Sequence, residues 1–165
     1  MDGAALVLCE GVFGTGDGKT ANGLVRHTER YQIAGVLDSR LAGRDAGEVL
    51  GGDARAIPIF ASLAEALEKV ADRPTHLVIG LAPDGGRLPD AYRNVVIEAL
   101  RAGMNVDSGL HQFLSDDPEL SKLAEEHGAD VVFFEIEDHS SDVVGELEQF
   151  SGHGVFEAVD AGDPV

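Results

Sequence analysis

The chain has 165 residues, 44% of them apolar, which is enough to bury the core of a single domain. Its formal net charge of −18, from 30 acidic and 12 basic residues, disfavours nucleic acid and anionic membrane surfaces as partners, because the long-range field repels phosphate. No stretch resembles a signal peptide or a membrane span, and the single Cys9 cannot form an internal disulfide, so we expect a cytoplasmic protein.

A glycine-rich stretch, residues 11–20, follows the first predicted strand, which is the apolar run of residues 4–9. A helix is expected to begin directly after it, near Ala21. Strand, glycine turn and helix together direct several backbone N–H groups, and the positive end of the helix dipole, at one point. Such a point is suited to bind an anion.

The glycine-rich stretch fits two phosphate-binding motifs imperfectly. Gly18-Lys19-Thr20 matches the end of a Walker loop, but Gly14 leaves that loop one residue short. The dinucleotide fingerprint is met at Gly14 and Gly16, whereas its third position holds Lys19. We favour a phosphate or pyrophosphate site, and an ordinary structural turn without a ligand is the alternative. The contacts to the phosphate would come from Gly14, Thr15, Gly16, Gly18, Lys19 and Thr20.

The rest of the chain alternates between strands and helices. Further strands are predicted at residues 31–38, 75–81, 104–106 and 130–136. Residues 39–55 form a loop with a short helical turn, residues 57–60 a short extended piece, and helices begin at Ser62, Pro89 and Asp117-Pro118. This pattern predicts an α/β fold with a doubly wound parallel sheet of about five strands in a three-layer sandwich.

Ligands of such sheets bind beyond the carboxyl ends of the strands. Asp38 stands there where a ribose-binding carboxylate is expected, although a strand-terminal cap is the alternative. His111 is the only histidine predicted at this edge and is a candidate general base, against a surface or structurally bonded role. Neither metal-ligand spacing nor a hydrolase triad is present. The other candidate binding residues at this edge are Ser39, Arg40, Ala82, Pro83, Arg87, Ser108 and Gly109.

The acidic residues are spread unevenly along the chain. Twelve of them follow Lys122, and this last part of the chain contains no Lys or Arg. A high-salt cytoplasm, in which screening removes the self-repulsion, would explain an acid-rich and lysine-poor surface. The alternative is an acidic end that binds a partner or acts as a solvating tail. We favour the halophilic interpretation because Asp and Glu are enriched throughout.

Several segments together resemble the N-terminal Rossmann-like domain of domain-of-unknown-function family 1611, which includes D-glutamate N-acetyltransferases. They are residues 18–26, 30–31, 36–39, 42–50, 57–59, 80–89 and 108–118. The resemblance implies a Rossmann-like domain that binds acetyl-CoA or another phosphate-bearing nucleotide, such as NAD(P) or ATP. It further implies an N-acyltransferase of amino-acid metabolism, often a homo-oligomer.

The resemblance also implies a division of the chain. Residues 1–137 are expected to form the Rossmann-like nucleotide- or CoA-binding domain, and residues 138–165 an acidic helix and tail. Members of the family carry a second domain with its own phosphate-binding loop, which residues 151–165 do not contain. The alternatives are a one-domain relative, an isolated fragment, or one half of a split protein whose partner is a separate P-loop domain or chain. A non-catalytic dinucleotide-binding, regulatory or oligomerisation module is the alternative function.

Overall fold

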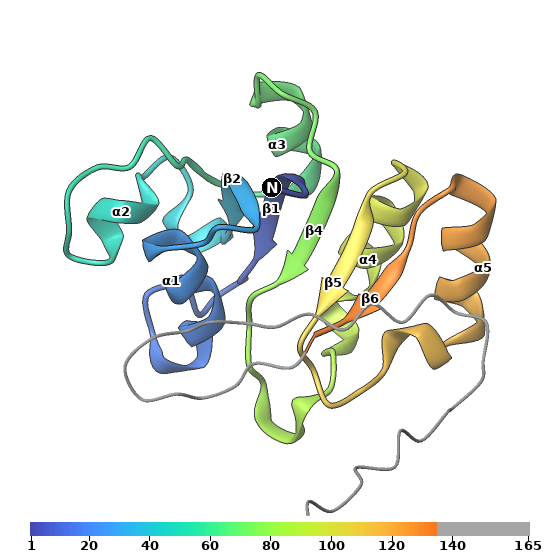
Figure 1. Ribbon diagram of the computed structural model, residues 1–165. Coiled ribbons are helices and arrows are strands. Elements are labelled where there is room, and N and C mark those ends of the chain that lie inside the picture. Colours follow the sequence, from blue (N-terminus) through green and yellow to red (C-terminus); the bar gives the residue numbers. More distant parts are fainter. Residues whose placement is uncertain (135–165) are drawn as a thin grey trace, which may run out of the picture.

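The computed structural model describes residues 1–134. Within them, six parallel strands form one sheet in the order β3-β2-β1-β4-β5-β6 (Figure 1). The sheet confirms the predicted α/β class but has one strand more than the five that were counted, because Ile59 and Phe60 pair with β2. The strands are β1 (Gly3–Leu8), β2 (Tyr31–Leu37), β3 (Ile59–Phe60), β4 (His76–Ile79), β5 (Asn105–Ser108) and β6 (Val131–Phe133).

The helices cover both faces of the sheet. On β1, Leu6 and Leu8 belong to one buried cluster with α3, α4 and α5, whereas Val7 belongs to another with α1 and α2. Because successive side chains of a strand point to opposite faces, these two clusters lie on the two sides of the sheet. The chain is therefore a three-layer sandwich, with helices α1 (Lys19–Arg26), α2 (Ala46–Val49), α3 (Leu63–Lys69), α4 (Asp90–Arg101) and α5 (Pro118–His127).

Polar caps fix where α3 and α5 begin. At α3, the Ser62 hydroxyl accepts a hydrogen bond from the Glu65 N–H at 3.1 Å, as the capping-box motif predicts. The Glu65 carboxylate reaches back to the N–H of Ala61 at 2.8 Å, one residue before the expected position. At α5, the Asp117 carboxylate accepts from the first-turn N–H groups, and Gly128 ends the helix in the left-handed region at φ 65°. These starts and stops agree with the sequence.

The strand order has its switch point at β1. The chain continues from β1 to β2 on one side, and the later strand β4 pairs with β1 on the other side. The loops that follow β1, β2, β4 and β5 consequently emerge at one edge, the carboxyl edge, where open α/β sheets bind ligands. The predicted residues 135–136 of the last strand and the predicted acidic helix and tail at 138–165 lie outside the described residues.

Candidate functional site

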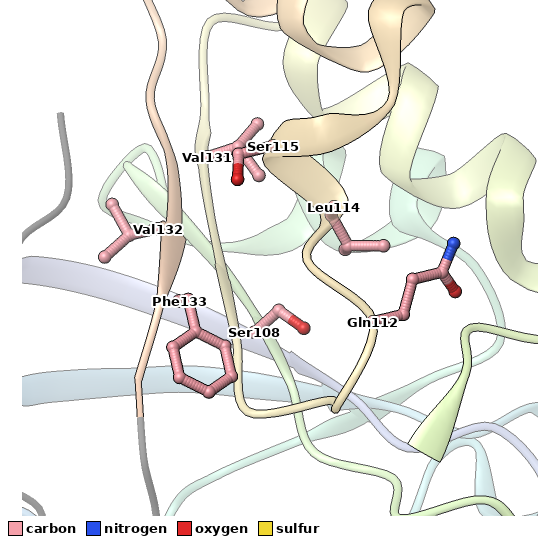
Figure 2. A pocket seen from close by; sticks show the side chains of 7 residues that line it. All are labelled: Ser108, Gln112, Leu114, Ser115, Val131, Val132 and Phe133. Atoms are coloured by element: carbon pink, nitrogen blue, oxygen red, sulfur yellow. The ribbon is translucent and has the colours of Figure 1, made fainter. Parts of the chain in front are cut away.

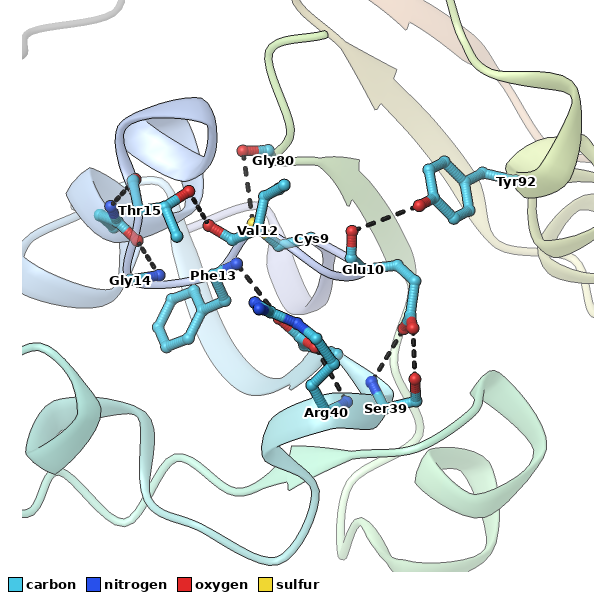
Figure 3. A network of polar contacts seen from close by, with 12 residues as sticks. Cys9, Glu10, Val12, Phe13, Gly14, Thr15, Ser39, Arg40, Gly80 and Tyr92 are labelled. Atoms are coloured by element: carbon cyan, nitrogen blue, oxygen red, sulfur yellow. Dashed lines mark hydrogen bonds and ion pairs between the residues drawn. The ribbon is translucent and has the colours of Figure 1, made fainter.

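The glycine-rich loop is held in place by two polar side chains. Asn22, in the first turn of α1 and only 8% exposed, accepts from the Gly14 N–H at 3.0 Å and donates to the Thr15 carbonyl at 2.9 Å. Asp38 accepts from the N–H of Phe13 at 3.1 Å. The Phe13 ring is buried in the cluster beneath α1 and α2. The loop is therefore a rigid, internally bonded turn (Figure 3).

Gly18 allows α1 to approach the end of β1. A Cβ atom at this position would lie 2.5 Å from the Val12 carbonyl oxygen and 2.9 Å from the Cys9 sulfur. This close packing between helix and strand is the role of the third glycine in a dinucleotide-binding turn. The spacing of the fingerprint puts Lys19 at that position instead; Lys19 is exposed and begins α1 two residues earlier than the sequence predicts. Gly80, directly after β4, likewise allows α1 to approach, because a Cβ there would lie 2.7 Å from the Cβ of Ala21.

Part of the loop remains open to a ligand. Gly16 is exposed, and a Cβ atom built on it would meet no atom within 4 Å. The N–H groups of Gly16 and Asp17 have no acceptor among residues 1–134, whereas those of Phe13, Gly14, Thr15 and Gly18 do. Two adjacent exposed N–H donors beside an open glycine fit an anionic oxygen.

The end of β2 brings a second group of predicted residues to the loop. The Asp38 side chain is completely buried, and its carboxylate also accepts from the Arg40 N–H at 3.0 Å and from the Arg40 guanidinium at 3.3 Å. Glu10, which directly follows Cys9, accepts hydrogen bonds from both the N–H and the hydroxyl of Ser39. The ends of β1 and β2 are thus joined by one network of polar contacts, drawn in Figure 3.

Cys9 is part of the core, as predicted. It is fully buried, and its thiol lies 3.8 Å from the Gly80 carbonyl, to which it donates a weak hydrogen bond. Burial, and next the negative charge of Asp38, raise the pKa of Cys9 to about 12. The thiol therefore stays protonated and is a poor nucleophile at neutral pH.

The loops after β4 and β5 complete the carboxyl edge. The Asp17 carbonyl accepts from the Ala82 N–H at 2.7 Å, which ties the Ala82-Pro83 turn to the glycine-rich loop. His111 is exposed, and its ring fills the space beside Gly86, where a Cβ would lie 2.3 Å from Cδ2. Arg87 is exposed next to this contact. These contacts join the Ala82 turn to the glycine-rich loop, and His111 to the turn that contains Gly86.

Ser108 and Gly109 lie at the end of β5. Ser108 is 2% exposed, and its hydroxyl accepts from the Leu110 N–H at 3.3 Å. Figure 2 shows the small pocket beside it, which lies against β6 and has no room for a water-sized sphere. Ser108 therefore supports the loop from inside and does not present its hydroxyl to a ligand as the loop stands. The pocket is lined by Ser108, Gln112, Leu114, Ser115, Val131, Val132 and Phe133.

A larger groove lies away from the carboxyl edge. Its space of about 220 Å³ is bordered by Tyr31, the first residue of β2, and by Arg26 and His27 at the end of α1. These elements end or begin at the opposite edge of the sheet from the glycine-rich loop. The groove therefore lies outside the candidate site at the carboxyl edge. Among residues 1–134, no three metal-ligating side chains come together in a way that could hold a metal ion.

A buried carboxylate in β5 was passed over by the sequence analysis. Asp107 is 1% exposed, and one of its oxygens accepts from the Tyr31 hydroxyl. Burial raises the pKa of Asp107, while the hydrogen bond from Tyr31 and the charge interaction with His76 oppose the shift. Burial and the Asp107 charge likewise raise the pKa of the Tyr31 hydroxyl. This contact passes over β1 and β4, which lie between β2 and β5 in the sheet, and ties β2 to β5.

Two residues of the site are not predicted from the sequence, although the elements that carry them are. Asn22 and Glu10 anchor the loop and the end of β2, yet both types of side chain are common on surfaces. The only available signal was position: Asn22 falls in the first helical turn after a glycine-rich loop, and Glu10 directly follows a buried strand.

Within residues 1–134, none of the helices is both long and apolar enough to cross a membrane.

Several known proteins are similar to this chain. A D-glutamate N-acetyltransferase from Tritonibacter scottomollicae is 42% identical over 52 residues, which are 32% of this chain and 16% of the relative. A 4-hydroxy-tetrahydrodipicolinate reductase from Geobacillus kaustophilus (strain HTA426) is 32% identical over 110 residues, which are 66% of this chain and 38% of the relative. The chain therefore spans well under half the length of these relatives.

A solved structure and a family model agree with the fold. The crystal structure of a DUF1611 family protein from Anabaena variabilis ATCC 29413 matches with a TM-score of 0.68 and 32% identity, over 84% of this chain and 38% of that chain. The model of the domain of unknown function DUF1611_N, a Rossmann-like domain, matches residues 39–133. This stretch begins just after Asp38 and leaves the glycine-rich loop outside it. Because it covers more than half of the chain, the protein belongs to the DUF1611_N family of Rossmann-like domains.

Proposed function

We propose that this Rossmann-like domain binds a phosphate-bearing nucleotide cofactor at the carboxyl edge, between the glycine-rich loop and the end of β2. One observation carries the proposal: the exposed N–H groups of Gly16 and Asp17 lack acceptors among the described residues, and they lie in the turn at the switch point of the sheet. Lys19, exposed at the start of α1, would add a positive charge for the phosphate. Thr20, half-buried beside it, would contribute its hydroxyl.

The relatives favour two kinds of cofactor. Two of the similar proteins carry the name D-glutamate N-acetyltransferase, and one carries the name of a reductase. An acetyltransferase uses an acyl donor such as acetyl-CoA, and a reductase of Rossmann-like fold uses a nicotinamide dinucleotide. Both ligands contain adenosine and a pyrophosphate, which are the parts that this edge of the sheet would hold.

Acetyl transfer to the amino group of D-glutamate is the specific reaction that we propose for a protein containing this domain. Bound acetyl-CoA would supply the acetyl group, its thioester C–S bond breaking as the C–N bond forms and CoA leaving as the free thiol. The exposed His111, fixed beside Gly86, would accept the proton that the amine loses as its nitrogen forms the new amide bond. Arg87, exposed on the neighbouring turn, would hold a carboxylate of the amino acid. The reaction is tested by following release of free CoA with the two enantiomers of glutamate.

The binding proposal is tested by thermal unfolding with acetyl-CoA, NAD, NADP and ATP at constant ionic strength. A ligand that binds the folded state alone raises the unfolding temperature as its concentration rises, and we expect this for at least one of the four. The matched variant is Gly16→Val, whose Cβ would meet no atom within 4 Å and whose methyl groups would occupy the open space above the loop. It should unfold like the wild type without ligand and lose the stabilisation. If none of the four raises the unfolding temperature, the proposal is wrong.

A non-catalytic module, regulatory or oligomeric, is the second candidate function. The observation that favours it is the internal bonding of the loop, in which Asn22 and Asp38 occupy the N–H groups of Gly14 and Phe13. A nucleotide that binds without supporting acetyl transfer would favour a regulatory role. A change of molar mass in light scattering upon nucleotide addition would identify an oligomerisation role.

A further inference from the structure

The carboxylate at the end of β2 is not available to a ribose. Asp38 is 0% exposed, and its two oxygens accept from the Phe13 N–H, the Arg40 N–H and the Arg40 guanidinium. In a dinucleotide-binding sheet this position either binds the ribose hydroxyl through a carboxylate or lies near an arginine that accommodates a phosphate on the ribose. The buried Asp38 carboxylate cannot bind a ribose hydroxyl unless it gives up the hydrogen bonds that hold the glycine-rich loop.

The guanidinium of Arg40 lies at the surface next to the buried Asp38 carboxylate. The Arg40 side chain is 52% exposed, and only one of its nitrogens, Nη2, is bonded to Asp38. A guanidinium has five N–H donors, so most of them remain available to an incoming group. Figure 3 shows the Arg40 side chain lying across the gap between the Phe13 backbone and Ser39, at the junction of the glycine-rich loop with the end of β2.

We propose that Arg40 makes the site selective for adenosine nucleotides whose ribose carries a phosphate. The inference rests on the proposed cofactor site and adds its specificity. A planar guanidinium binds phosphate through paired, charge-assisted hydrogen bonds, whereas it gains little from a free ribose hydroxyl. NADP and CoA both contain a phosphorylated adenosine ribose; NAD and dephospho-CoA do not. The ligand class is therefore defined by that phosphate.

One nearby charge opposes this selectivity. Glu10 lies at the same junction, and its carboxylate accepts both hydrogen bonds that Ser39 donates. A negative charge there repels a ribose phosphate, and the strong acidity of the whole chain adds to the repulsion. Glu10→Gln keeps an oxygen acceptor for Ser39 and removes the charge. This substitution should therefore strengthen binding of the phosphorylated nucleotides more than binding of the others.

Isothermal titration calorimetry at constant ionic strength tests the proposal with two matched pairs, NADP against NAD and CoA against dephospho-CoA. The wild type should bind the phosphorylated member of at least one pair about tenfold more tightly or better, as one charge-assisted contact provides. Arg40→Ala should bring that ratio close to one. Arg101→Ala, which removes an exposed arginine at the far end of α4, controls for the change in net charge and should preserve the ratio.

The outcomes separate this inference from the proposed cofactor site. Equal or tighter binding of NAD and dephospho-CoA would overturn the selectivity while leaving the cofactor site intact. An Arg40→Ala variant that keeps the wild-type ratio would overturn the assignment to Arg40. If the wild type binds none of the four nucleotides, the proposed function fails and this inference fails with it.

Discussion

Replacing Asp38 with alanine is expected to lower the free energy of unfolding by about 3 kcal/mol. The substitution leaves the Phe13 N–H without an acceptor in a fully buried setting, and it removes the acceptor of the Arg40 N–H and guanidinium. An unsatisfied buried donor retains its full desolvation cost, which exceeds the net stabilisation of one exposed contact. Equilibrium urea denaturation followed by circular dichroism measures the difference.

Arg40→Ala is the matched control for this substitution. It removes the ion pair with Asp38 but leaves the carboxylate as an acceptor for both backbone N–H groups. Because the Arg40 side chain is half-exposed, its loss should cost less than about 1 kcal/mol. If the two substitutions lower the free energy of unfolding equally, the ion pair holds the loop, and not the hydrogen bonds from the backbone N–H groups to Asp38. Our account of Asp38 would then be wrong.

Gly18→Ala is expected to destabilise the fold by about 1–3 kcal/mol and to weaken nucleotide binding. The new methyl group would stand 2.5 Å from the Val12 carbonyl oxygen, a backbone atom that cannot move without displacing the whole loop. Backbone strain plays no part, because the φ of Gly18 is −99°, a value open to any residue. The expected loss of stability therefore comes only from steric overlap where α1 packs against the end of β1.

Gly16→Ala, two residues earlier in the same turn, tests this explanation. A methyl group there meets nothing within 4 Å, so the free energy of unfolding should change by less than about 0.5 kcal/mol. Chemical denaturation of both variants under one set of conditions gives the comparison. A Gly18→Ala variant as stable as Gly16→Ala would show that α1 does not depend on this close approach.

The sequence predicted the fold well because its signals were long and repeated. Apolar runs at residues 31–38 and 75–81 indicated buried parallel strands, and Asp117 with Pro118 indicated a helix start. The strand β3 was not counted among the predicted strands because only two of its residues pair with β2, which is too few to produce a recognisable sequence pattern. Its existence depends on contacts with the rest of the sheet.

The site was predicted less completely, for reasons that are also physical. The position of Asp38 at the end of β2 followed from the strand pattern, but its burial and its bonds to Phe13 and Arg40 depend on how two distant segments meet. The same holds for Gly18, whose role became evident only from its distance to Val12 and Cys9. Spacing alone puts Lys19, and not Gly18, at the third position of the dinucleotide fingerprint.

Amide chemical shifts of the isotope-labelled protein, recorded by NMR during titration with the nucleotide that stabilises it most, test the central claim most directly. If the turn after β1 is the cofactor site, the signals of Gly16, Asp17 and Arg40 will shift with one common dissociation constant. Signals from the groove at the opposite edge, such as those of Arg26 and Arg55, will stay in place. Shifts confined to that groove, or no shift at Gly16 and Asp17 at saturation, would contradict the account.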